Sequence, residues 1–366
     1  MELHPLESMT LSEAKKVQFR IVDITTKYFT GKEVLSLGDL GVVPGINKPT
    51  YTVKVESVLK ELFHTEAAVL LRGAGTGALR EGLQAVLKPT GVLLVHDAPV
   101  YPTTQNTLEN MGIRLVRANF NDLEDLRHVL KENEMDAALI QYTRQKMDDS
   151  YTMEEVIQTI REIKGNLPII TDDNYAVFKA REIGVELGAD LSAFSTFKLL
   201  GPEGVGVLLG SKERIEKVIS RNYSGGSQVQ GHEAMEVLRG LIYAPVMIAI
   251  QNEVLMETKE RLDNKEIAGI KASYIANAQS KVLLVEFNED IAKKVLVEAE
   301  KLGAAQNPVG AESKYEFVPM FYRVSGTFRA FDPTIEERMI RINPMRSGPD
   351  TIIRILRESM EKIERR

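Results

Sequence analysis

The chain of 366 residues has a formal net charge of −6 and a pI near 5.6, so it lacks the basic field that attracts nucleic acid or an anionic membrane surface. It contains no cysteine, which excludes disulfides, thiolate zinc sites and any mechanism that needs a cysteine nucleophile or persulfide carrier. Hydrophobic residues make up 43% and charged residues 27%, as in ordinary globular proteins, and the length favours two domains.

The first two thirds of the chain alternate short apolar runs with segments of helical spacing. A helix at residues 11–29 and a Gly- and Pro-rich loop at residues 38–49 precede this alternation. The alternation predicts βα units, and so an α/β fold with a three-layer, mostly parallel sheet covered on both faces. The expected strands are residues 67–71, 91–95, 114–118, 137–140, 168–170, 191–194 and 205–209, and the expected helices are 53–63, 77–87, 105–111, 123–132 and 153–163.

The pattern changes after residue 221. Residues 231–262 form one long helix-compatible stretch, which Pro245 is expected to break or kink. The shorter units that follow predict a smaller C-terminal α+β domain. Its expected strands lie within residues 281–287, 317–323 and 339–343, and its expected helices at 290–302 and 349–365. The expected domains are an N-terminal helix and arm at 1–45, a large domain at 46–262 and a small domain at 263–366.

A glycine-rich segment, RGAGTGA at residues 72–78, lies between an expected strand and an expected helix. Its glycines let the backbone approach an anion, and the free N–H groups of the helix start, with the Thr76 hydroxyl, suit a phosphate. A tight βα turn would use the same glycines. The segment lacks the Gly-Lys-Ser/Thr of a Walker A loop and fits the dinucleotide fingerprint poorly.

Two further polar segments follow buried strands. In TDDNYA, residues 171–176, the carboxylates suit either a surface turn or a protonated ring nitrogen. In SAFSTFKLLGPEGVG, residues 192–206, Ser195 precedes Lys198 by three residues, but the Ser-Asp-Asn and Lys-Thr-Gly partners of a serine acyl-transfer site are missing. A lysine at a strand end can also simply snorkel into solvent.

The order of these segments is more informative than any one of them. A glycine-rich loop, then Asp172 at a strand end, then Lys198, is what a pyridoxal 5′-phosphate (PLP) site requires. The loop would hold the phosphate, Asp172 would keep the ring nitrogen protonated, and Lys198 would form the Schiff base with the aldehyde.

With FKLLGPEGVGVLLG at residues 197–210 and TDDNYA, the chain resembles the fold-type I PLP enzymes, within them the class V aminotransferase-like group, and most closely an enterobacterial class V-like protein group. The resemblance implies the fold-type I PLP-transferase large domain. It implies that Tyr175 bonds the ring hydroxyl, and that Tyr101 of HDAPVYPTT, or alternatively His96, stacks on the ring. The residues implied to bind the phosphate are Gly75, Thr76, Gly77 and Ser195.

The resemblance also implies a substrate side. In IRINPMRSGPD, residues 340–350, Arg341 would pair with the substrate α-carboxylate, which a planar guanidinium suits bidentately. Arg346 and Arg329 are alternatives for that role. Arg144, with Gln145 beside it, is a second candidate near the cofactor.

The function implied is a PLP-dependent enzyme acting on an amino acid. Transamination is the first expectation, and β- or γ-elimination or a selenocysteine synthase-like transfer is the alternative. Desulfuration by the persulfide route is disfavoured because no cysteine could carry the sulfur. A non-catalytic module on the same fold and a Rossmann-type dehydrogenase remain less supported alternatives.

The remaining expectations concern partners and location. We expect no metal, no nucleic acid and no membrane partner. The glycine-rich segment at residues 222–231 resembles the loop that crosses to a neighbouring subunit, which implies a homodimer with shared active sites. No apolar run approaches the roughly 20 residues of a membrane helix, and the N-terminus lacks the apolar segment of a signal peptide, so a cytoplasmic location is expected.

Overall fold

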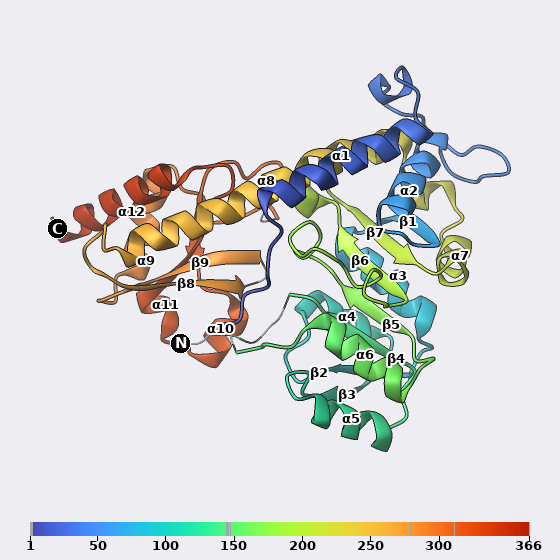
Figure 1. The fold of residues 1–366 in the computed structure, drawn as a ribbon, viewed down its shortest axis with the longest axis horizontal. Helices are drawn as coiled ribbons and strands as arrows, with labels where there is room; N and C mark the ends of the chain where they lie inside the picture. Colours follow the sequence, from blue (N-terminus) through green and yellow to red (C-terminus); the bar gives the residue numbers. More distant parts are fainter. Residues whose placement is uncertain (1–2, 144–145, 147, 279, 311, 366) are drawn as a thin grey trace. The chain divides into compact units, whose positions relative to one another are not determined.

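The computed structural model describes residues 3–143, 146, 148–278, 280–310 and 312–365. Its chain forms two compact units, coloured by sequence in Figure 1. The sheet unit contains residues 12–142 and 151–245, and the C-terminal unit contains residues up to Leu11, 143–150 and 246 onward. The boundary falls at Pro245, inside the long helix α8 (Gly231–Asp263). The domain limits expected from the sequence remain a prediction.

The sheet unit is built on one seven-stranded sheet in the order β1-β7-β6-β5-β4-β2-β3. Neighbouring strands from β6 to β3 run parallel, and β7 alone runs antiparallel to both of its neighbours. The mostly parallel α/β sheet is therefore confirmed. The strands are β1 (Ala67–Arg72), β2 (Val92–His96), β3 (Arg114–Ala118), β4 (Ala137–Gln141), β5 (Ile169–Asp172), β6 (Leu191–Ser195) and β7 (Val205–Gly210).

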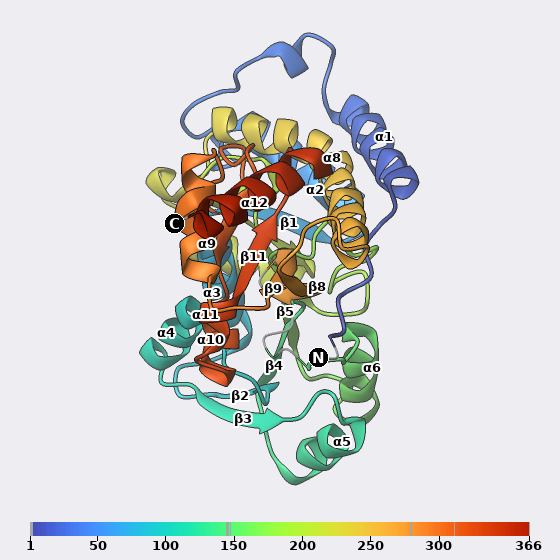
Figure 2. The same cartoon turned by 90° about the vertical axis from the view of Figure 1, so that its left-hand side faces the viewer.

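Helices cover both faces of this sheet, with α3 and α4 on one side and α6 on the other in Figure 2. The continuous apolar runs explain this layering, because successive side chains point to opposite faces. Leu93 belongs to a core cluster that includes residues of α3, α4 and α7, whereas Leu94 belongs to one that includes residues of α5 and α6. The helices of this unit, besides the first part of α8, are α1 (Leu11–Tyr28), α2 (Thr50–Leu62), α3 (Ala74–Val86), α4 (Pro102–Asn110), α5 (Leu123–Glu132), α6 (Met153–Ile163) and α7 (Lys212–Arg221). The 3-10 turns are η1 (Glu33–Leu35), η2 (Phe197–Leu199) and η3 (Gly225–Ser227).

The C-terminal unit has an antiparallel four-stranded sheet in the order β10-β11-β9-β8. Its core joins apolar residues of this sheet with those of α9, α12 and the end of α8. This confirms the second, smaller α+β part of the fold. Its strands are β8 (Ile270–Ala278), β9 (Ser280–Phe287), β10 (Met320–Arg323) and β11 (Met339–Asn343), and its helices are α9 (Ala292–Lys301), α10 (Gly326–Phe331), α11 (Ile335–Arg338) and α12 (Pro349–Glu364). None of the helices in the described residues is long and apolar enough to cross a membrane.

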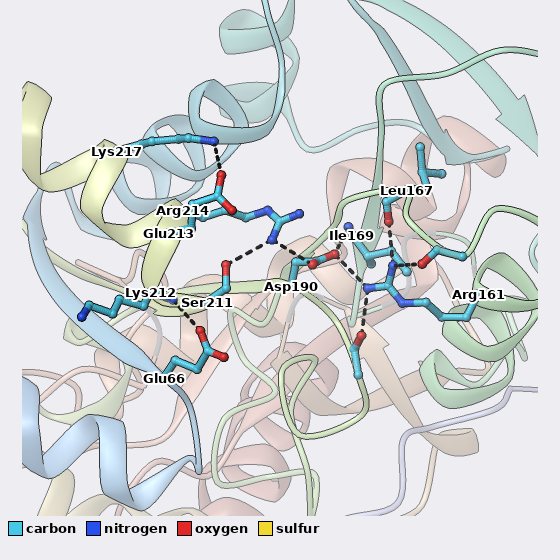
Figure 3. Close-up of polar contacts among 12 residues, drawn as sticks. Glu66, Arg161, Leu167, Ile169, Asp190, Ser211, Lys212, Glu213, Arg214 and Lys217 are labelled. Atoms are coloured by element: carbon cyan, nitrogen blue, oxygen red, sulfur yellow. Dashed lines mark hydrogen bonds and ion pairs between the residues drawn. The ribbon is translucent and has the colours of Figure 1, made fainter.

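Asp190 lies just before β6 and bonds to groups at the amino end of the neighbouring strand β5 and on two helices (Figure 3). Its Oδ2 accepts hydrogen bonds from the Ile169 backbone N–H and from Arg161, both at 2.8 Å. Arg214 of α7 lies 3.1 Å from the other carboxylate oxygen. Because these partners come from β5, α6 and α7, one carboxylate links both helical layers to the sheet.

Replacing Asp190 with alanine is expected to lower the free energy of unfolding by about 2–3 kcal/mol, since it leaves two half-buried guanidinium groups without their shared partner. Urea unfolding measured by circular dichroism checks this. Glu213→Ala is the matched control, because the Glu213 pair with Lys217 in Figure 3 is largely exposed and its loss should leave the midpoint unchanged. Equal midpoints for Asp190→Ala and the wild type would contradict the role given to Asp190.

Candidate active site

The candidate site lies at the carboxyl ends of β5 and β6, where ligands bind in open α/β sheets. Asp172 ends β5 and pairs in register with Ala193 of β6, which ends two residues later at Ser195. Lys198 follows in η2. Parallel pairing of these two strands therefore brings Asp172, Ser195 and Lys198 to one edge of the sheet.

Lys198 is held by a compact turn. The turn ends at Leu200 in the left-handed conformation (φ 63°), and the Thr196 hydroxyl donates to the Val205 carbonyl at 2.9 Å across its base. The Lys198 Nζ lies 3.7 Å from the centroid of the Tyr175 ring, which is a cation–π contact. Tyr175 itself has a positive φ of 64°, which is uncommon for a tyrosine and turns its ring toward Lys198.

Asp172 is buried, and its environment acts on its charge in two opposing ways. Burial raises the pKa of the Asp172 carboxyl, whereas hydrogen bonds from Asn174 and the positive charge of Lys198 lower it. The Asn174 side chain and backbone N–H both donate to Oδ1, at 2.7 and 3.1 Å. These partners suit a carboxylate that faces a cationic ring nitrogen.

The adjacent Asp173 points to the opposite face of the sheet, so the two carboxylates have separate environments. Its Oδ2 accepts hydrogen bonds from the Thr171 hydroxyl at 2.9 Å and from the Gly184 N–H at 3.3 Å. Its Oδ1 has no hydrogen-bond partner among the described residues. Complete burial raises the pKa of Asp173 to about 7.

Asp173→Asn is expected to change how stability depends on pH. The raised pKa means that folded Asp173 holds a proton that the unfolded chain releases near pH 4, so wild-type stability falls as pH rises from about 4 to 7. The asparagine variant lacks this loss. The difference in unfolding free energy between variant and wild type should therefore become about 2–3 kcal/mol more favourable to the variant between pH 5 and pH 8. Urea unfolding at the two pH values measures it, and a difference independent of pH would contradict the assigned pKa.

The glycine-rich segment forms the start of α3, beside the lysine turn. Gly73 has a φ of 93°, and its N–H and that of Ala74 both donate to the Gly204 carbonyl, at 2.8 and 3.1 Å. A Cβ at Gly75 would lie 2.6 Å from the Asn174 side chain, so only glycine fits there. A Cβ at Gly77 would lie 2.0 Å from the Arg72 carbonyl, which gives this glycine a packing reason of its own. The first turn of α3 thus lies next to Asn174.

Tyr101 caps α4 close to the same edge. Burial and the negative charge of Asp172 both raise the pKa of Tyr101, so its hydroxyl group lies within the field of that carboxylate. Thr103 lies in the first turn of α4, and its hydroxyl is 3.2 Å from the Thr76 hydroxyl of α3. The alternative, His96, accepts a hydrogen bond from the Phe120 N–H at 3.0 Å and packs on the Phe120 and Tyr151 rings. These contacts favour Tyr101 for the stacking position.

The expected substrate arginine belongs to the C-terminal unit. Arg341 of β11 is buried, donates from Nε to the Arg323 carbonyl at 2.8 Å, and stacks with its guanidinium carbon 4.0 Å from the Tyr322 ring centroid. Of its alternatives, Arg329 pairs with Glu336 at 3.4 Å, and the Arg346 Nη1 donates to Gln251 at 3.4 Å. Arg144 and Gln145 lie outside the described residues.

The structure therefore gathers most of the expected residues of the sheet unit and adds two that the sequence did not single out. The two additions are Asn174 and Thr103. Asn174 follows Asp172 by two residues, in a segment whose residue types are those of an ordinary turn. Its spacing to Asp172 was the one feature of the sequence that pointed to it. No group of three or more His, Asp or Glu among the described residues could hold a metal ion.

Two family models match the chain. Residues 104–238 match the model described as Aminotransferase class-V, and residues 256–356 match the model described as YhfS-like, C-terminal domain. The protein YhfS of Escherichia coli (strain K12) is 53% identical over 363 residues, which cover 99% of this chain and 100% of YhfS. The crystal structure of that protein, described as pyridoxal-5′-phosphate dependent, matches with a TM-score of 0.97.

More distant solved structures share the fold. A carbon-sulfur lyase involved in aluminum resistance from Clostridium novyi NT is 18% identical, with a TM-score of 0.71 over 96% of this chain and 91% of the lyase. A cystathione gamma lyase (CalE6) from Micromonospora echinospora is 16% identical, with a TM-score of 0.74 over 94% of this chain and 98% of the lyase. At these identities the likeness concerns the fold.

The residues at the site fit PLP chemically. The first turn of α3 and the Thr76 hydroxyl suit a phosphate, and the buried Asp172 suits a protonated ring nitrogen. The amine of Lys198 lies next to both Tyr175 and the Asn174 amide, at the same strand ends as Asp172. The site thus offers a separate matching group for each of the phosphate, the ring nitrogen and the aldehyde.

Proposed function

Because the chain belongs to the YhfS-like family of pyridoxal phosphate-dependent proteins, we propose that it acts on the α-carbon of an amino acid, with Lys198 as the catalytic amine and base. The observation that carries this proposal is the Lys198 amine at the same sheet edge as the buried Asp172 carboxylate. When bound, PLP supplies an electron sink for the charge that develops at the substrate α-carbon.

Each residue has a definite task in this proposal. Lys198 would hold the cofactor through its aldehyde and would move the proton at the substrate α-carbon. Asp172 holds the proton on the ring nitrogen by remaining negatively charged. The Thr76 hydroxyl and the N–H groups of Gly75 and Thr76 would hold the phosphate, and Tyr101 would stack on the ring. Arg341 is proposed to bind the substrate α-carboxylate, as a guanidinium does bidentately.

For the reaction itself we propose elimination at the β- or γ-carbon, which the sequence had suggested only as the alternative. The solved structures that match over nearly the whole chain include a carbon-sulfur lyase and a cystathione gamma lyase. An amino acid with a thiol or thioether leaving group is then the substrate class. Transamination is the second candidate, supported by the match of residues 104–238, which contain Asp172 and Lys198, to the class V aminotransferase model.

Incubation of the PLP-loaded protein with a panel of amino acids separates these reactions. Elimination releases ammonia, a 2-oxo acid and a thiol without any added acceptor. Transamination requires a 2-oxo acid acceptor and releases no ammonia. The panel should therefore be run with and without 2-oxo acids, with coupled assays for ammonia and thiol. Turnover that appears only with an acceptor would reject elimination.

We also propose that the protein is a homodimer, as expected from the family resemblance. The segment between α1 and α2 supports an interface, because Leu35, Leu37 and Leu40 are 82%, 77% and 75% exposed. Exposed leucines so close in sequence are unusual on a monomer surface and suit a second copy of the chain. Sedimentation equilibrium should give twice the mass of 40.9 kDa, and a monomer at micromolar concentration would reject the proposal.

A further inference from the structure

The Asn174 side chain makes contacts with three groups of the site at once. Its Nδ2 donates to the Asp172 Oδ1 at 2.7 Å. Its Oδ1 accepts a hydrogen bond from the Ser195 backbone N–H at 3.0 Å and one from the Lys198 Nζ at 3.4 Å. One amide therefore links the carboxylate expected at the ring nitrogen to the amine expected at the aldehyde.

These partners fix the orientation of the amide. The Ser195 N–H can only donate and the Asp172 carboxylate can only accept, so the oxygen must face Ser195 and the nitrogen must face Asp172. An aspartate here would place a second acceptor against Asp172, and an alanine would supply neither group. Asparagine offers a donor and an acceptor at the required spacing.

Packing holds the amide in this position from the other side. An added Cβ at Gly75 would lie 2.6 Å from Asn174 Oδ1 and 2.7 Å from Nδ2. The first turn of α3 therefore closes on the amide at van der Waals distance, and the phosphate-binding turn touches the residue that joins Asp172 to Lys198.

We propose that Asn174 is a positioning residue of the PLP site, which holds the Asp172 carboxylate and the Lys198 amine in the arrangement that the cofactor requires. This inference deepens the cofactor assignment and rests on it. It does not depend on whether the reaction is an elimination or a transamination, because Asn174 acts on the groups that hold the cofactor.

The proposal has an electrostatic consequence that a purely structural role would not have. The Asn174 hydrogen bonds lower the pKa of Asp172 against the effect of burial. The other charged or titratable groups that act on Asp172 are Lys198, Tyr101 and Asp173. Removing the amide takes away the hydrogen bonds to Asp172 while the charges of these three groups remain, so Asp172 should take up a proton at higher pH in an Asn174 variant.

The test is the affinity of the apoprotein for PLP as a function of pH, measured by isothermal titration calorimetry. Asn174→Ala should move the acid limb of the affinity profile to higher pH by about one unit or more, which is about a tenfold loss of affinity per unit below the midpoint. Asn174→Asp, which keeps the side-chain shape, should move it at least as far. Titrations of PLP itself are common to all variants and cancel in the comparison.

Thr103→Val is the matched control, because it removes a hydrogen bond to Thr76 without touching Asp172. It should lower the affinity by the same factor at every pH. Circular dichroism of each apoprotein reports whether it is folded. A wild-type pH midpoint in both folded Asn174 variants, with or without a uniform loss of affinity, would overturn the proposal. Absence of PLP binding by the wild type would instead overturn the cofactor assignment, so the two failures are distinguishable.

Discussion

Lys198→Ala is expected to lower turnover by about 10³-fold or more and to remove the covalent attachment of the cofactor. The turn η2 positions this amine 3.7 Å from the Tyr175 ring centroid and 3.4 Å from the Asn174 Oδ1, closer to that ring than the Lys179 amine at 5.4 Å. PLP should still bind noncovalently, since the α3 turn and the Asp172 side chain are retained. The predicted variant is therefore a folded protein that holds its cofactor and does not react.

Borohydride reduction followed by mass spectrometry of the peptides measures the attachment directly. The wild type should carry the reduced cofactor on the peptide containing Lys198, and the variant should carry none. Lys212→Ala is the control, since Lys212 lies on the surface helix α7 with its side chain 72% exposed. Labelling of a different lysine in the wild type would show that the covalent anchor lies elsewhere.

Asp172→Asn is expected to lower turnover by about 10²–10³-fold with little change in stability. The substitution keeps the shape and the oxygen that accepts from Asn174, but removes the charge that holds the proton on the ring nitrogen. Loss of one preorganised electrostatic partner typically has an effect of this size on catalysis. The visible absorbance of bound PLP should shift with it, because the ring nitrogen loses its anionic partner.

Asp173→Asn separates the effect of Asp172 on the cofactor from a general effect of removing a negative charge at the end of β5. Asp173 is adjacent in sequence but faces Thr171 and Gly184 on the other side of the sheet. Its asparagine variant should therefore keep the wild-type cofactor spectrum while its stability changes with pH. If Asp173→Asn altered the spectrum and Asp172→Asn did not, the assignment of the two carboxylates would be wrong.

Strands buried on both faces were predictable because they give continuous apolar runs, as in β2, where Leu93 and Leu94 pack on opposite helical layers. Besides the short 3-10 turns, four elements were not predicted, namely α7, α10, α11 and β8, and two of them show why. β8 is the edge strand of the second sheet, and Lys271, Ser273 and Asn277 interrupt its apolar pattern. α7 is a short, strongly polar helix that buries only Ile215 and Val218, so it gave no apolar run to mark it. Edge strands and surface helices owe their stability to tertiary packing that a local pattern does not contain.

Which residues meet at the site was predictable from the sequence, but their individual contacts were not. Parallel strands place their carboxyl ends together, so the proximity of Asp172 and Lys198 follows from the fold class. The contacts of Asn174 do not follow from it, because they depend on a turn conformation and on one side-chain rotamer. Alternation along β5 separates Asp172 from Asp173, but it assigns a face to each only once the helices on both sides are known.

The hydrogen bonds from Gly73 and Ala74 to the Gly204 carbonyl fix the length of the segment that carries Lys198. These bonds join the first turn of α3 to the segment that follows Lys198. The residues between Lys198 and Gly204 therefore set the distance between the Lys198 amine and the start of α3. One inserted residue adds about 3.5 Å of chain, far more than a reacting amine tolerates. Natural variation in this segment should therefore appear as substitutions, whereas insertions and deletions should be confined to other loops.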